Sequence, residues 1–191
     1  MSSNSRTAFA TPFFVTVLVM ALTGLLVSLQ GRIHWCACGH WHPWTSSVVS
    51  AHNSQHLFDP YSFTHIAHGL LLFLLLQWLA PHWSLLRRYT IILAVEGAWE
   101  VLENTAWIIH RYREATLSLG YEGDSVLNSM ADVLCCALGF GIAWKWGRVR
   151  TVALFAAMEL VLLFTIRDNL TLNVLMLICP VESIKTWQMA A

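Results

Sequence analysis

The sequence contains few charged residues. Asp, Glu, Lys and Arg make up only 12% of its 191 residues, about half of the ~25% that is usual in a soluble domain. Eleven basic and eleven acidic residues cancel to a net charge of zero. This balance provides no basic surface for a nucleic acid, so we predict no nucleic-acid partner. The chain also lacks repeats and low-complexity segments, and we predict one integral membrane domain over 1–191.

Apolar residues are abundant in the chain. They make up 57% of the chain, the mean hydropathy is +0.57, and ten tryptophans suit membrane interfaces. The apolar segments lie at about 12–30, 64–80, 89–110, 125–146, 150–166 and 170–180. The first five approach the ~20 residues that a spanning helix needs, whereas the last is short and its crossing stays open. We predict an all-α polytopic transmembrane helix bundle with five to six membrane segments and an outer loop at 31–63.

The topology follows from the basic residues. We expect the first segment to be retained, because it is longer than the ~7–15 apolar residues of a signal peptide. With a cytoplasmic N-terminus, seven of the eleven basic residues lie inside, as the positive-inside rule favours. The four outside are Arg32, Arg111, Arg113 and Arg167. We predict a multi-pass protein of the bacterial inner membrane.

Three glutamates lie on one face of segment 89–110. Glu96, Glu100 and Glu103 have the spacing i, i+4, i+7. A carboxylate facing lipid costs about 2.5–3.5 kcal/mol on insertion scales, so this face must meet protein or water. The glutamates could pair with arginines between helices, or line a functional cavity, which we favour. We expect Glu96 to be protonated or hydrogen-bonded to a neighbouring helix, and Glu100 and Glu103 to be reactive.

A second polar pattern stands at the start of segment 64–80. His65 and His68 are spaced i, i+3, which suits metal ligation or a general base with an orienting partner. The alternative is a pair of interfacial histidines bonded to backbone.

A third pattern opens segment 125–146, where Asp124, Asn128 and Asp132 share one helical face. Asp124 could instead be a helix cap, but Asp132 lies too far inside the helix for that.

Alternation of the helices places these residues, the histidines and the glutamates at one end of the bundle. Cations and amides follow at the same end, at Arg111, Arg113, Arg167, Asp168 and Asn169. The arginines could clamp a phosphate or neutralise the acids.

The outer loop carries CACGHWHPW at 36–44. Cys36, Cys38, His40 and His42 alternate and could hold a soft or borderline metal ion. A strained disulfide between the two cysteines is the alternative in an oxidising compartment.

Long stretches of the chain resemble a known family. SQHLFDPYSFTHIAHG, WEVLENT, IIHRYREATLSLGYEGDSVLNSMAD and RDNLTLNVLMLICP resemble an uncharacterised bacterial multi-pass inner-membrane family. The chain is more distantly similar to VanZ-like membrane proteins. That similarity places a helix histidine at His65 or His68, an acid at Glu100 or Glu103, and then Arg113, Asp124, Asn128 and Gly139. It implies chemistry on lipid head groups or lipid-linked precursors.

Three hypotheses follow, and the residues leave open whether the chain is an enzyme. The leading one is an enzyme at the outer leaflet acting on a membrane lipid. Its catalytic candidates are His65, His68, Glu100, Glu103, Arg113, Asp124, Asn128 and Asp132, and its substrate-binding candidates are Arg111, Arg167, Asp168 and Asn169. The second is metal handling, with a divalent cation at Glu100, Glu103 and Asp132, or in the Cys/His loop. The third is a non-catalytic membrane component.

Overall fold

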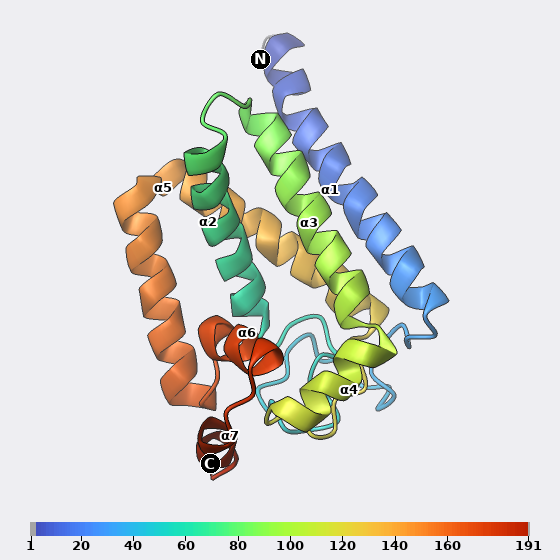
Figure 1. Ribbon diagram of the computed structural model, residues 1–191. Coiled ribbons are helices and arrows are strands. Elements are labelled where there is room, and N and C mark those ends of the chain that lie inside the picture. The colour runs from blue at the N-terminus through green and yellow to red at the C-terminus, as the bar shows by residue number, and fades with distance from the viewer. Residues whose placement is uncertain (1–2, 191) are drawn as a thin grey trace.

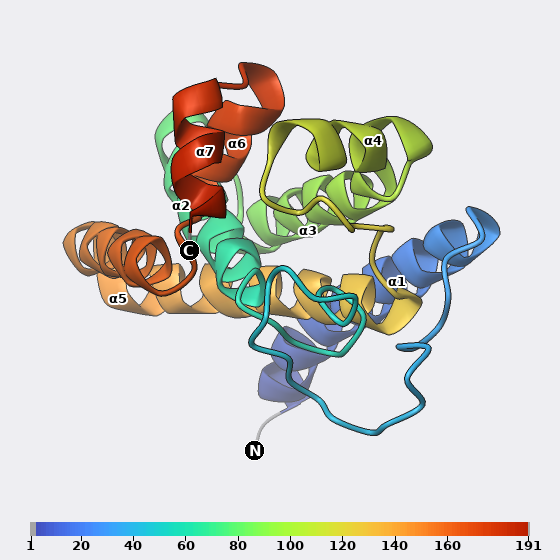
Figure 2. The ribbon, with the colours of Figure 1, turned by 90° about the horizontal axis from the view of Figure 1, so that it is seen from below.

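The computed structural model describes residues 3–190, with side chains from Ala10 onward, and this part of the chain is all-helical. The helices are α1 (Ser3–Leu29), α2 (Ser62–Leu79), α3 (Leu85–Glu103), α4 (Ala106–Ala115), α5 (Val126–Ile166), α6 (Leu170–Ile178) and α7 (Glu182–Met189). The long helices α1, α2, α3 and α5 form a bundle, and the loop before α2 gathers with α4, α6 and α7 at one end (Figures 1 and 2).

Three of these helices are long and apolar enough to cross a membrane: Ala10–Leu29, Ser62–Leu79 and Val126–Ile166. Their outer faces expose large apolar side chains such as Phe13, Leu75 and Phe164, as lipid contact requires. The all-helical class is confirmed, and the number of crossings stays a prediction. Helix α6 has nine residues, about 14 Å at 1.5 Å per residue, which is too short to cross a bilayer core.

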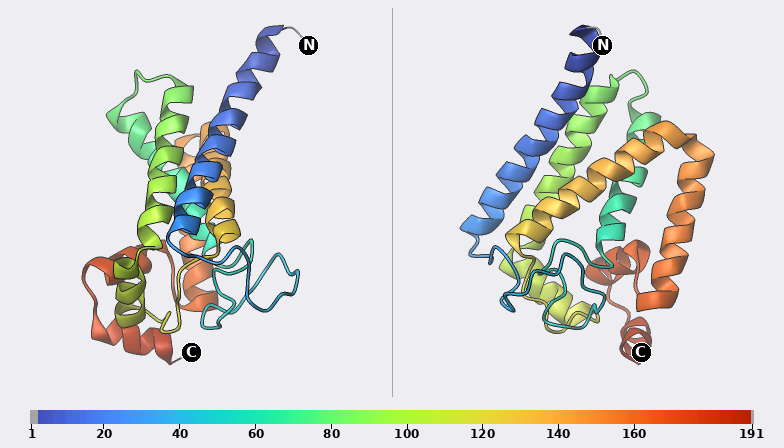
Figure 3. Two further views of the ribbon diagram at one scale, coloured as in Figure 1. Left: turned by 90° about the vertical axis from the view of Figure 1, so that its right-hand side faces the viewer. Right: turned by 180° about the vertical axis from the view of Figure 1, so that it is seen from behind.

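Helix α5 doubles back on itself. Gly147 has φ 72° and ψ 171° inside this 41-residue helix, a conformation that glycine adopts without a Cβ penalty. The second leg runs back at an angle to the first, so that the two legs diverge from the kink (Figure 3). They correspond to the predicted segments 125–146 and 150–166.

The predicted segment 89–110 differs from the structure, which has two helices there with a break at Asn104 and Thr105. The Thr105 side chain accepts a hydrogen bond from Ile108 N and so caps α4. The Asn104 side chain donates to Glu100 O and to Asp124 Oδ2. Because these polar groups end α3, Glu103 lies in its last turn, next to the loops.

Two glycines bring α2 and α5 into backbone contact. A Cβ on Gly69 would lie 2.1 Å from Cys136 O, and one on Gly139 would lie 2.1 Å from Ile66 O. Around this crossing the core packs Leu70, Phe73, Ile92, Leu93, Val133 and Phe140. The close approach places the first two turns of α2, which carry His65 and His68, against the turn of α5 that carries Asp132.

Candidate functional site

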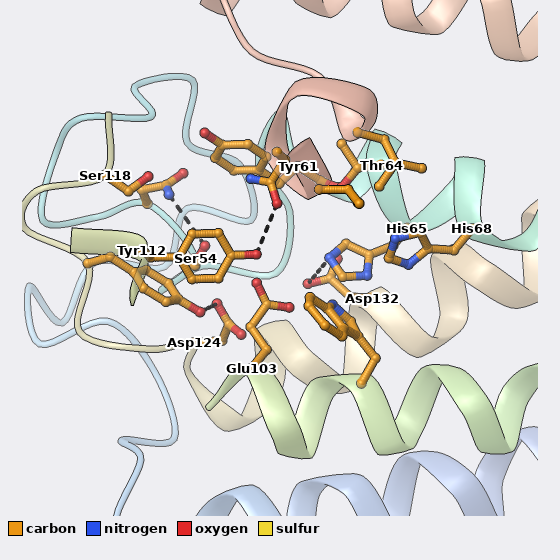
Figure 4. A pocket seen from close by; sticks show the side chains of 16 residues that line it. Ser54, Tyr61, Thr64, His65, His68, Glu103, Tyr112, Ser118, Asp124 and Asp132 are labelled. Carbon is orange, nitrogen blue, oxygen red and sulfur yellow. Dashed lines mark hydrogen bonds and ion pairs between the residues drawn. The ribbon is translucent and has the colours of Figure 1, made fainter. Parts of the chain in front are cut away.

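A small cavity lies where α2, α3 and α5 meet the loops and α6. Its volume is about 50 Å³, and α2 contributes His65 and His68, α3 contributes Glu103, and α5 contributes Asp132 (Figure 4). Asp124 lines it from the loop before α5. Among the residues that the structure describes, no lysine or arginine lines this cavity.

Glu96 holds both histidines from behind the cavity. His65 Nδ1 lies 2.6 Å from Glu96 Oε1, and His68 Nδ1 lies 2.9 Å from Glu96 Oε2. The expected hydrogen bond between Glu96 and a neighbouring helix is therefore present, with Glu96 as the acceptor, and it joins α3 to α2. Since Nδ1 of each ring is engaged with the carboxylate, Nε2 is the nitrogen left for another partner. His65 Nε2 lies 3.9 Å from Asp132 Oδ2.

Glu100 lies next to this pair. Its side chain is fully buried, its Oε1 lies 3.2 Å from His65 Nδ1, and neither carboxylate oxygen has a hydrogen-bond partner among the described residues. Glu103 Oε2 and Asp132 Oδ1 are likewise buried and unbonded. Unpaired buried carboxylate oxygens are costly, so this cluster calls for a proton or a cation.

Two overlapping groups have the spacing of metal ligands. One is His65, His68 and Glu96, and the other is His65, Glu100 and Glu103. In each group one ligand atom per residue lies within 4.8 Å of the others. His65 belongs to both, which makes it the centre of the cluster.

Asp124 belongs to a hydrogen-bond network at the loop side of the cavity. It accepts from Tyr121 Oη at 2.8 Å and from Asn104 Nδ2 at 2.9 Å. Burial raises the pKa of Asp124 to about 6. The residue that caps α5 is Ser125, which accepts from Asn128 N. Asn128 itself does not line the cavity, and its side chain donates to Leu57 O at 3.3 Å.

The predicted arginines are not brought to the cavity. Arg111 donates to Leu177 O at 2.8 Å, Arg167 donates to Trp187 O at 2.9 Å, and Arg113 donates to Tyr121 O. Each anchors a surface segment through a backbone carbonyl. Neither alternative for these arginines, a phosphate clamp or neutralisation of the acids, is seen among the residues described as lining the cavity.

Asp168 and Asn169 also lie outside the cavity lining. Asp168 accepts from Tyr61 Oη at 3.0 Å, and the Asn169 side chain accepts from Leu172 N and caps α6. Both residues hold the α5–α6 turn in place, and Tyr61 links it to the cavity.

The loop cysteines have different partners from those that the alternating sequence suggested. Cys36 and Cys38 lie with His52 and His56. His40 and His42 are exposed and face each other, with ring centroids 5.9 Å apart. The expected ligand pair His40 and His42 is therefore replaced by two histidines further along the chain, because the loop folds back on itself. The cysteines are free thiols.

Sequence reasoning missed the aromatic lining. Tyr61, Tyr112 and Tyr121 line the cavity together with Trp99. Three of the four tyrosines of the chain therefore gather here. The three tyrosines share no helical spacing, because they come from three separate loop or helix-end positions. The signal that could have indicated them is the preference of tyrosine for partly polar surroundings.

Comparisons with known proteins place the chain among bacterial proteins without an assigned activity. It is 48% identical to a UPF0314 protein of Sphingopyxis alaskensis over 93% of this chain and 95% of that protein. The UPF0314 protein R03235 of Rhizobium meliloti is 45% identical over 89% of this chain and 86% of its own length. A relative in Paracoccus denitrificans is 42% identical over 94% of this chain and 93% of its own length.

No solved structure matches the chain. The similarity to VanZ-like proteins is not tested by these matches and stays a prediction. The family model described as "Protein of unknown function (DUF2585)" matches residues 26–190. The predicted uncharacterised family is thereby confirmed, and the chain belongs to the DUF2585 family, together with its UPF0314 relatives.

Proposed function

We propose that this protein is a membrane metalloprotein that binds one divalent cation at His65, Glu100 and Glu103. The observation that carries the proposal is Glu100, a fully buried carboxylate beside His65 with no hydrogen bond to either oxygen. A cation bound there would supply the missing partner for a group that is otherwise costly to bury.

The surrounding groups support this assignment. Imidazole and carboxylate ligands suit Zn²⁺, Mn²⁺ or Fe²⁺ rather than a soft ion. Glu96 accepts from Nδ1 of both histidines, which is how carboxylates in metal sites orient a ligating imidazole from behind. The lack of lysine and arginine in the described lining leaves the negative charge for a cation to balance.

The size of the cavity favours an ion over a lipid head group. A cavity needs at least ~10–15 Å³ to hold one water molecule, and this one has about 50 Å³. It would hold an ion with one or two waters, whereas a phosphorylated head group requires the walls to open.

The test is a calorimetric titration of the detergent-purified protein, stripped by a chelator, with Mn²⁺, an ion that suits carboxylate ligands rather than thiolates. We expect one binding event that Glu100→Gln weakens at least tenfold. The matched control is Glu114→Gln, an exposed glutamate on α4. Equal affinities for wild type and Glu100→Gln would overturn the proposal, provided that both elute as the same folded species.

A second function, an enzyme acting on lipid head groups, is favoured by one observation. An apolar groove of about 490 Å³ runs beside the cavity and shares His68, Trp99, Leu170 and Val174 with it. An acyl chain lying in this groove would bring its head group next to His68 and the proposed cation, which would supply Lewis-acid chemistry there.

Comparative lipidomics tests this second function in a deletion strain complemented with wild type or with Glu103→Gln at equal abundance. We expect a lipid class to accumulate in the Glu103→Gln strain. Identical lipid profiles would exclude this function and leave the metal proposal intact.

For localisation, we propose the bacterial inner membrane, supported by the apolar helices and the bacterial relatives.

A further inference from the structure

The loop before α2 contains a second cluster of metal-ligand residues, outside the acidic cavity. Cys36, Cys38, His52 and His56 each offer one ligand atom within 4.8 Å of the others. Cys36 Sγ lies 3.1 Å from His52 Nδ1, and Cys38 Sγ lies 3.9 Å from His56 Nε2. We propose that these four side chains form a structural zinc site.

The distances fit a tetrahedral ion. With Zn–S near 2.3 Å and Zn–N near 2.0–2.1 Å, a tetrahedral site separates sulfur from nitrogen by about 3.6 Å. The two sulfur–nitrogen distances, 3.1 and 3.9 Å, lie on either side of that value. Both distances are therefore close to the separation that one shared ion requires, and all four ligand atoms lie within 4.8 Å of one another.

Burial and chemistry also point to an ion. His56 is 4% exposed, and its Nδ1 is buried with no hydrogen-bond partner in the part of the chain that the structure describes. Cys36 is buried, whereas His52 is exposed and borders a surface hollow of about 440 Å³ through which an ion can enter. Two thiolates and two imidazoles are the Cys₂His₂ ligand set of structural zinc sites, which differs from the oxygen-rich set in the cavity.

The order of the ligands along the chain has features of known zinc motifs. Thirteen residues separate Cys38 from His52, and three separate His52 from His56. Both intervals match the C…(x₁₂₋₁₅)…H-x₃₋₅-H pattern of Cys₂His₂ sites. The first pair, with one intervening residue, is shorter than the usual C-x₂-C.

The site would brace the loop that covers the cavity. Asn53 and Ser54, between the two histidine ligands, line the acidic cavity. Ser54 O accepts from Ser125 N at 2.8 Å, and Gln55 Nε2 donates to Gly123 O at 2.6 Å. A zinc ion that joins His52 and His56 to the two cysteines would therefore hold the residues closing the cavity from the loop side.

Cobalt substitution of the full-length protein in detergent tests the site, because thiolate-to-cobalt charge transfer gives a near-ultraviolet band that carboxylate and imidazole ligands do not. We expect the band in reduced wild type loaded with Co²⁺, and its loss in Cys38→Ser and in His52→Ala/His56→Ala. His40→Ala/His42→Ala is the matched control and should keep it. Glu100→Gln should also keep it, which separates this site from the one in the cavity.

Three results would overturn the proposal. The first is no charge-transfer band in reduced wild type, a result that does not depend on any variant folding. The second is loss of the band in His40→Ala/His42→Ala with His52 and His56 intact. The third is a Cys36–Cys38 disulfide, found by peptide mass spectrometry in protein taken from membranes without reductant.

Discussion

His65 Nδ1 lies 2.6 Å from Glu96 Oε1, the shortest of the contacts between α2 and α3 in the acidic cluster. The same carboxylate reaches His68. One glutamate thus fixes the orientation of both imidazoles, while the Glu100 carboxylate and Glu103 Oε2 have no hydrogen-bond partner among the described residues. The proposed metal site depends on this division of roles among the three glutamates.

Glu96→Gln tests the orienting role. An amide can satisfy the two imidazoles less well than a carboxylate, and changes to such supporting groups typically cost 10–100-fold in metal affinity. We expect that loss in a calorimetric titration, with the binding stoichiometry unchanged. Unaltered affinity would mean that Glu96 only joins the helices.

Gly69→Ala tests the helix crossing. The added Cβ would lie 2.1 Å from Cys136 O, so α2 and α5 must separate, at a cost of roughly 1–3 kcal/mol or more. Gly141→Ala is the matched control on α5, because nothing lies within 4 Å of its Cβ. Thermal unfolding in detergent should show a lower midpoint for Gly69→Ala and an equal or higher one for Gly141→Ala. Equal midpoints for Gly69→Ala and wild type would contradict the crossing.

Asp124 predicts a pH dependence of stability. Burial raises its pKa to about 6 in the folded protein, whereas an unfolded aspartate titrates near ~4. Between these two pH values Asp124 therefore keeps its proton in the folded state and has lost it in the unfolded state. Its contribution to the free energy of unfolding is fully present below about pH 4 and disappears as the pH rises through about 6.

Asp124→Asn should flatten that slope in unfolding midpoints measured from pH 4 to 7. Burial also raises the pKa of Asp168 to about 6, so part of the slope should remain in this variant. The exposed Glu122 provides the control, Glu122→Gln, which should leave the slope unchanged. A full slope in Asp124→Asn would show that this carboxyl does not titrate in the window.

Arg113→Ala separates a structural arginine from a phosphate ligand. The side chain donates to Tyr121 O, and an unpaired carbonyl costs about 1–3 kcal/mol where it is buried. We expect a lower unfolding midpoint and an unchanged metal stoichiometry. Loss of metal binding at full stability would instead bring Arg113 into the site.

The sequence predicted the elements that regular helical spacing controls. The i, i+3 histidines and the i, i+4, i+7 glutamates face one another because each spacing defines one side of a helix. The break at Asn104 was not predicted, since it depends on the contact with Asp124, 20 residues away. The pairing of Cys36 and Cys38 with His52 and His56 likewise depends on how an irregular loop closes, which no local periodicity encodes.

The metal content of the purified protein shows whether a cation is bound at His65, Glu100 and Glu103. Wild type and Glu100→Gln should be purified from membranes in parallel and analysed by inductively coupled plasma mass spectrometry. We predict one equivalent of divalent metal less per chain in Glu100→Gln, whatever the loop site holds. Equal metal content in two equally folded proteins would contradict the account.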